Sequence, residues 1–325
     1  ISFRGKTPGI AIGEFPVFSY SVATVCKIAG GWSEAITKLV SLFFFFSVIF
    51  VWWKFQKLRY SLTDNSSLWF WIVCIVGIPV NLTYLSIPFP EATALLFIGI
   101  GGWLWELVKV KKNDSQKLLR VLACLAFLLG FLIRPYYISF LFFFWPGLIT
   151  VGLTGLASVG LFYLWYRYWD RRVTTNIYYG IGLESFRTLL AGVPSALAVL
   201  PKRLVDHTAW VGLYFFGLTF RSNPRLIYFY LANILMMLGL KSGYLFDHPY
   251  YLLNAGIAAS LISFDAFLKM SNKQRNLFAT LLLLSTTAST QHNWRAPNNE
   301  QAILKLVEQG KSLPKDALVA SFLGP

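Results

Sequence analysis

Long apolar runs recur along most of this chain, and short basic clusters separate them. A helix of about 20 apolar residues crosses the ~30 Å hydrocarbon core of a bilayer, where lipid cannot hydrogen-bond an exposed backbone. The composition agrees, since 56% of the 325 residues are hydrophobic and only 13% are charged. The runs therefore predict an all-α polytopic membrane protein, a helical bundle and not a barrel.

The basic clusters orient the predicted spans. The spans cover residues 34–53, 68–86, 91–108, 117–133, 137–166, 208–220, 226–240, 249–267 and 276–289, and Trp145-Pro146-Gly147 breaks the fifth. Lysines and arginines gather at 54–59, 109–120, 221–225 and 269–275. Placing these four clusters in the cytoplasm gives one consistent zigzag, as the positive-inside rule requires. The net charge of +15 is thus explained without a nucleic-acid partner.

The same pattern divides the chain into three parts. We expect residues 1–33 to form the first outer (periplasmic) loop with a juxtamembrane helix. Residues 34–290 form the transmembrane bundle, including an outer interfacial segment at 167–207. Residues 291–325 read as a helix, a turn and a strand, which predicts the start of a soluble outer α/β domain. The chain begins without Met and ends on this strand, so we expect a piece of a longer protein at both ends.

Acidic residues are scarce, and two of them stand out. Of the 14 acids, the ones that the zigzag places in the cytoplasm are Asp64, Glu106, Asp114 and Asp265. On the outer side, Glu91 follows Pro90 and Glu14 lies two residues before Pro16, each near the start of an apolar helix, where an unpartnered carboxylate is costly. Structural roles are open for both. Glu91 could be a first-turn acid that the helix dipole favours after Pro90, and Glu14 a loop acid in water.

Further polar residues mark the outer ends of other spans. Arg134, before Pro135, could hold a phosphate or snorkel to the interface. The stretch Asp247-His248-Pro249-Tyr250-Tyr251 joins an acid, an imidazole and two phenols, although a lone histidine is more often structural. The sequence contains no nucleotide-binding loop and no metal-spaced Cys/His set. Such a chain suits a substrate delivered by lipid, for example a sugar on a polyprenyl phosphate.

Four stretches, in order along the chain, resemble a known family. They are "GKTPGIAIGEFPVFSYSVATVCKIAGGWSEAITKLVSLFFFFSVIFVWW", "SIPFPEATALLF", "LIRPYYISFLFFFWPGL" and "DHPYYLLNAGIAASL". Together they resemble GT-C glycosyltransferases of the protein O-mannosyltransferase and lipid A aminoarabinose transferase kind, similar to glycosyltransferase family 39. The resemblance covers nearly the whole chain.

The resemblance implies a GT-C-like bundle in the bacterial inner (plasma) membrane, with its active site facing outward. The enzyme would move a sugar from a polyprenyl-phosphate carrier to a hydroxyl of a glycan, lipid or protein. In this family a principal catalytic acid lies in the first outer loop, and here that position would precede Ile1. Glu14 and Glu91 are then secondary catalytic acids of the cavity. The substrate- and phosphate-binding residues are Arg134, His248, Tyr250 and Tyr251.

Other readings stay open at this point. The spacing of histidines, cysteines and acids in the sequence predicts no metal site. A divalent metal ion stays open as a cofactor. A non-enzymatic transporter or flippase of lipid-linked sugars would also be polytopic, but it is expected to show charges within spans and inverted repeats. A polysaccharide polymerase would use the same carrier.

The charge pattern makes a testable topological prediction. In a background without the three native cysteines, a cysteine at residue 14 should react with an impermeant thiol reagent from outside intact cells. A cysteine at residue 111 should react only after the membrane is opened, because its loop belongs to a basic cluster. Labelling of both positions from one side would contradict the zigzag.

Overall fold

The computed structural model describes residues 16–63, 65–110, 115–144, 148–170, 223–239 and 252–294, and single positions at 194, 197, 198, 202 and 219. This part of the chain is mostly helical and contains no strand. By length and composition three of its helices can cross a membrane, and a bent pair makes a fourth. The three are α2 (Glu34–Arg59), α5 (Pro90–Val110) and α6 (Ser115–Ile133). The all-α class is confirmed, and these helices indicate a membrane protein.

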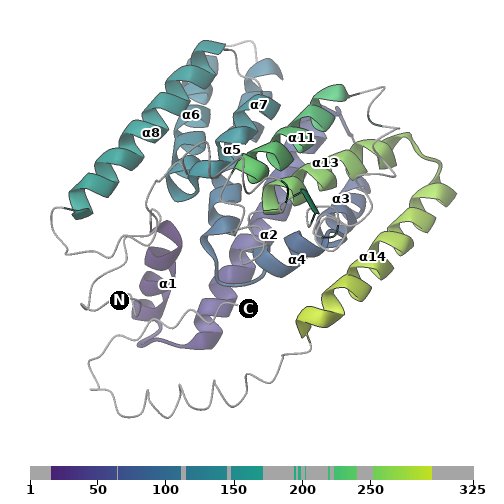
Figure 1. Cartoon of the computed structure of the whole chain (residues 1–325), viewed down its shortest axis with the longest axis horizontal. Helices are drawn as coiled ribbons and strands as arrows, with labels where there is room; N and C mark the ends of the chain where they lie inside the picture. Colours follow the sequence, from purple (N-terminus) through teal and green to yellow (C-terminus); the bar gives the residue numbers. More distant parts are fainter. Residues whose placement is uncertain are drawn as a thin grey trace.

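The remaining elements complete the bundle (Figure 1). They are α1 (Val17–Ile28), α3 (Ser67–Val76), α4 (Pro79–Leu85), the 3-10 helix η1 (Pro135–Ser139), α7 (Phe140–Phe144), α8 (Leu148–Asp170), α11 (Pro224–Gly239), α13 (Leu253–Lys269) and α14 (Asn272–Trp294). Helices α11, α13 and α14 coincide with the last three predicted spans. The predicted span at 208–220, most of the 167–207 segment and residues 295–325 lie outside the described residues.

Helices α5 and α6 form an antiparallel hairpin around the connection at 111–114. Contacts pair Gly101 with Phe127 and Ile98 with Gly130, so that residue numbers fall along one helix as they rise along the other. A Cβ atom at Gly130 would lie 2.6 Å from Ile98 Cγ1 and 3.0 Å from the Ala94 carbonyl oxygen. Small residues let two membrane helices approach this closely, which increases their van der Waals contact.

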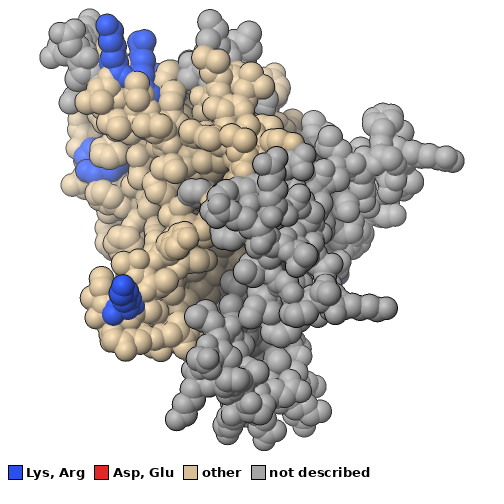
Figure 2. Space-filling view, turned by 90° about the vertical axis from the view of Figure 1, so that its left-hand side faces the viewer, with Lys and Arg blue, Asp and Glu red and all other residues tan. Residues whose placement is uncertain are grey.

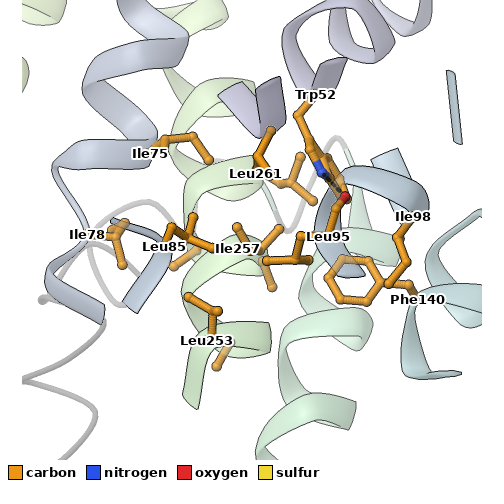
Figure 3. Packing of buried hydrophobic residues seen from close by; sticks show 14 of the residues in the cluster. Trp52, Ile75, Ile78, Leu85, Leu95, Ile98, Phe140, Leu253, Ile257 and Leu261 are labelled. Carbon is orange, nitrogen blue, oxygen red and sulfur yellow. Dashed lines mark hydrogen bonds between the residues drawn. The ribbon is translucent and has the colours of Figure 1, made fainter. Parts of the chain in front are cut away.

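Helix α2 packs against α5 through a buried tryptophan. Trp52 Nε1 donates a hydrogen bond to the Leu95 carbonyl at 3.0 Å (Figure 3). Gly99 makes this possible, because a Cβ atom there would lie 2.7 Å from the indole nitrogen. The ring of Trp52 also meets Phe140 edge to face, with centroids 5.6 Å apart. This contact joins α2 and α5 to the segment that follows α6.

The predicted span at 68–86 is not one straight helix. It divides into α3 and α4, which bend by 85° at Gly77 and Ile78. Pro79 begins α4, and a proline there has no N–H for the helical bond and clashes with the preceding turn. The predicted span is thus a broken pair of helices, because the apolar run contains a proline.

Side chains from three helices satisfy the carbonyls that the break exposes. In a bilayer such groups need a partner within the protein. The bonds are Ser260 Oγ to Cys74 O (2.8 Å), Asn81 Nδ2 to Ile75 O (3.3 Å), and Thr286 Oγ1 to Gly77 O. The bend is therefore a stable feature that α13 and α14 support.

Helix α13 is the buried centre of the bundle. Every residue from Leu253 to Phe267 is buried. Apolar or small residues occupy almost all of its surface, as expected for a helix that protein surrounds on all sides. It contacts α3, α4 and α11. This predicted span therefore faces protein and not lipid.

Two of the basic clusters meet at one end of the molecule. Tyr60, directly after α2, donates a hydrogen bond to Asp265 Oδ1 at 2.7 Å, and Lys269 forms an ion pair with the same carboxylate. Burial, and next the Asp265 charge, raise the pKa of Tyr60 well above its usual range, so its hydroxyl keeps the proton it donates. The clusters at 54–59 and 269–275 thus share one end, as the zigzag predicts.

The surface agrees with a membrane-embedded body. On the face shown in Figure 2, the described surface displays no acidic side chain, and most of its basic side chains lie in the upper part of the view. Large apolar side chains are exposed on α2, α6 and α8, for example Phe43, Leu125 and Leu156. Acyl chains would cover such residues in a bilayer.

The hairpin makes a testable prediction. Gly130→Ala should lower the free energy of unfolding by about 1–3 kcal/mol, because the new methyl group overpacks the contact with Ala94. Gly160→Ala in α8 is the matched control, since a Cβ atom there meets nothing within 4 Å. The control should be neutral or up to ~1 kcal/mol more stable, from helix propensity. Equal losses for both variants, measured by unfolding in SDS–detergent micelles, would contradict the close approach.

Candidate functional site

The α5–α6 hairpin brings Glu91 and Arg134 together at its open end. Glu91 lies 20 residues before residue 111 and Arg134 lies 20 residues after residue 114. At 1.5 Å per residue each is about 30 Å from the connection, which matches the hydrocarbon thickness. The pair therefore lies at the end of the hairpin opposite the connection.

Two prolines shape this end of the hairpin. Pro90 is the first residue of α5, a position that needs no N–H donor, and it places Glu91 in the first turn. Pro135 disfavours helical backbone at the preceding residue, and Arg134 is extended, with φ −140° and ψ 94°. Helix α6 thus ends directly before Arg134.

Glu91 and Arg134 form a buried ion pair. Arg134 Nη2 contacts Glu91 Oε1, and the two side chains are 7% and 0% exposed. Tyr136 donates a hydrogen bond to the same carboxylate oxygen at 3.3 Å. Glu91 Oε2 has no hydrogen-bond partner among the described residues. The carboxylate is therefore fixed through one oxygen, while the other is buried without a hydrogen bond from the described residues.

Hydrogen bonds extend the site from η1 into α11 and α13. Asn254 Nδ2 donates to the Tyr136 carbonyl at 3.3 Å and to Ser139 Oγ at 3.5 Å. Ser139 Oγ in turn donates to Asn233 Oδ1 at 2.7 Å. We use the name Glu91 cluster for the residues so connected, which are Glu91, Arg134, Tyr136, Ser139, Asn233 and Asn254. Four helical elements thus contribute to one polar site inside an apolar bundle.

The structure places some of the predicted site residues and not others. It brings Glu91 and Arg134 into direct contact, although the sequence predicted them separately, one as an acid and one as a phosphate ligand. Glu91 is in the first helical turn, as the helix-dipole reading requires, yet it is buried and paired and not in water. Glu14, His248, Tyr250 and Tyr251 lie outside the described residues.

Sequence reasoning missed the other members of the cluster. Asn233 and Asn254 each interrupt an apolar run, and polar side chains within membrane helices are often functional. That signal could have found them. Tyr136 and Ser139 follow the Arg134-Pro135 pair, and only the fold shows that they link it to α13.

The cluster does not fit a divalent metal ion. Glu91 is its only carboxylate, whereas such ions take several oxygen ligands. Among the residues that the structure describes, no group of three or more His, Cys, Asp or Glu side chains comes together. We therefore derive no chemical step through a metal.

The arrangement offers two kinds of binding group. A buried guanidinium can hold an anionic group such as a phosphate. A carboxylate oxygen without a hydrogen bond can accept one, or a proton, from a hydroxyl. No protein-family model, curated protein or solved structure matches the chain. What the site does must therefore be argued from its own residues.

The ion pair makes a testable prediction about stability. Arg134→Met alone should lower the free energy of unfolding by about 3 kcal/mol, because it leaves a buried carboxylate without its cation. Glu91→Gln alone should also destabilise, since it strands the guanidinium. The double variant should lose less than the sum of the two losses. Strictly additive losses, measured by SDS titration, would show that the two side chains do not interact.

Proposed function

We propose that this protein is an integral membrane glycosyltransferase that moves a sugar from a polyprenyl-phosphate carrier to an acceptor hydroxyl on the outer face of the membrane. The observation that carries the proposal is the buried Glu91–Arg134 pair, about 30 Å from a basic connection. Ionisable residues in membrane helices are costly and usually serve function. A charged pair at this depth suits a substrate whose charged group is anchored to lipid.

Arg134 is the proposed phosphate ligand. In the transfer, the acceptor oxygen bonds to the anomeric carbon of the sugar as the bond from that carbon to the phosphate oxygen breaks. The electron pair of the broken bond stays on the polyprenyl phosphate, and the negative charge of the phosphate increases. A fixed guanidinium stabilises this charge at low reorganisation cost. Glu91 holds the guanidinium in place for that role.

Glu91 has a second proposed role through Oε2, the oxygen that has no hydrogen-bond partner among the described residues. Oε2 can accept a hydrogen bond from a hydroxyl of the sugar or the acceptor. By the family resemblance, another acid takes the acceptor proton, and Glu91 is a secondary acid of the same cavity. Displacement at the anomeric carbon from the face opposite the phosphate inverts its configuration.

The other predicted residues complete the proposal. By the family resemblance, we also propose His248, Tyr250 and Tyr251 as ligands of the carrier phosphate and Glu14 as a further cavity acid. We also propose a GT-C-like arrangement of the helices in a bacterial inner membrane, with residues 291–325 beginning a soluble outer domain.

The bend between α3 and α4 also bears on the transporter alternative. Broken helices in transporters expose backbone carbonyls to the transported ion. Here the carbonyls of Cys74, Ile75 and Gly77 accept hydrogen bonds from side chains of neighbouring helices. Because these groups are already satisfied, the break serves packing better than ion binding.

The proposed function predicts a specific loss in Glu91→Gln. Transfer from polyprenyl-phosphate sugars in proteoliposomes should fall at least about tenfold, as expected when a charge is lost from a site where charge develops. Glu106→Gln is the matched control on the same helix, because Glu106 pairs with Lys109 near the other end of α5. The control should keep wild-type transfer.

Three outcomes would contradict the proposal in different ways. Wild-type turnover in Glu91→Gln would show that Glu91 has only a structural role, as a first-turn acid that the helix dipole favours. Movement of intact lipid-linked sugar across the bilayer without transfer would identify a transporter. Growth of a polysaccharide chain in place of single transfer would identify a polymerase.

A further inference from the structure

Helix η1 is short and depends on neighbours for its position. It has five residues, in keeping with the limited stability of 3-10 helices. Its first turn is closed by the Tyr137 amide, which donates to the Arg134 carbonyl at 3.1 Å. The segment also presents the Tyr136 hydroxyl to the ion pair. A shift of η1 would therefore move a ligand of Glu91.

Asn254 holds η1 at two points. Its side-chain nitrogen donates to the Tyr136 carbonyl near the start of η1 and to the Ser139 hydroxyl at its end. Asn254 is fully buried in the first turn of α13, the helix that protein surrounds on all sides. The side chain thus joins a short helix to a helix that is buried along most of its length.

Tyr136 depends on this attachment more than its neighbour does. Tyr137 is fully buried, whereas Tyr136 is only partly buried, and its ring meets Tyr137 at a centroid distance of 4.6 Å. Its hydroxyl reaches Glu91 Oε1 at 3.3 Å, already at the long end of the hydrogen-bond range. A displacement of a few tenths of an ångström would break this bond.

We propose that Asn254 is a positioning residue, which fixes η1 so that the Tyr136 hydroxyl stays on Glu91 Oε1. Tyr136 and Arg134 then share one carboxylate oxygen and so fix the orientation of the carboxylate. The catalytic part of this inference rests on the proposed function. The positioning itself does not, and it can be tested without any turnover.

The first experiment measures coupling by stability alone. Unfolding in SDS–detergent micelles is compared for wild type, Tyr136→Phe, Glu91→Gln and the double variant, and then for the same four proteins carrying Asn254→Ala. With Asn254 present, the Tyr136–Glu91 coupling should change the unfolding equilibrium constant by about threefold or more. With Asn254→Ala it should vanish. The inference is overturned if the coupling is absent in the proteins that keep Asn254. It is also overturned if the coupling persists in the proteins that carry Asn254→Ala.

The second experiment reads the same contact in catalysis. Tyr136→Phe and Asn254→Ala should each lower kcat by about tenfold with little change in KM, because the bound substrate meets a misaligned carboxylate. The double variant should lose no more than the larger single loss. Losses that multiply would show that Asn254 acts on stability or binding and not through Tyr136.

Asn81→Ala is the matched control for the loss of a buried asparagine. Asn81 is also fully buried, but its side chain donates to the carbonyls of Ile75 and Gly256 and to the Ser260 hydroxyl, away from η1. Any effect on kcat should therefore multiply with that of Tyr136→Phe. If wild type transfers no sugar from any donor, the proposed function fails, and the stability experiment still decides the role of Asn254.

Discussion

The buried ion pair between Glu91 and Arg134 is the constraint on which the rest of the site depends. A charge removed from water costs several kcal/mol unless its partner is close, so separation of the two helix ends would leave two unpaired charges in an apolar bundle. The pair therefore fixes the register of α5 against α6. It also fixes where η1 begins, because η1 starts at Pro135, directly after Arg134.

The register is possible only because the helices approach each other closely. Membrane helices gain little from hydrophobic burial against one another, since lipid is equally apolar. Contact area and internal hydrogen bonds must supply the association. Gly130 opens the α5–α6 contact, and Gly99 lets Trp52 reach a backbone carbonyl of α5. The same hairpin thus carries the close packing at its middle and the charged pair at its end.

The sequence predicts the features that depend on local pattern. Apolar runs predict the helices, the basic clusters at 54–59 and 269–275 predict a shared end, and the scarcity of acids points to Glu91. Contacts across the bundle leave no such pattern. Asn254 and Tyr136 are 118 residues apart, and Gly77 and Thr286 are 209 apart, so neither contact is visible before the fold is known. The pairing of Glu91 with Arg134 became visible only with the hairpin.

Helix α13 connects the two ends of the bundle. It carries Asn254 against η1 and, 11 residues later, Asp265 against Tyr60, a separation of about 16 Å along its axis. Between them, Ser260 supports the bend of α3 and α4. Each of these polar side chains is buried and hydrogen-bonded, so a shift of α13 would break bonds at three levels together. A helix held in this way is a fixed reference for the Glu91 cluster, and this is why a single asparagine at its start can set the position of η1.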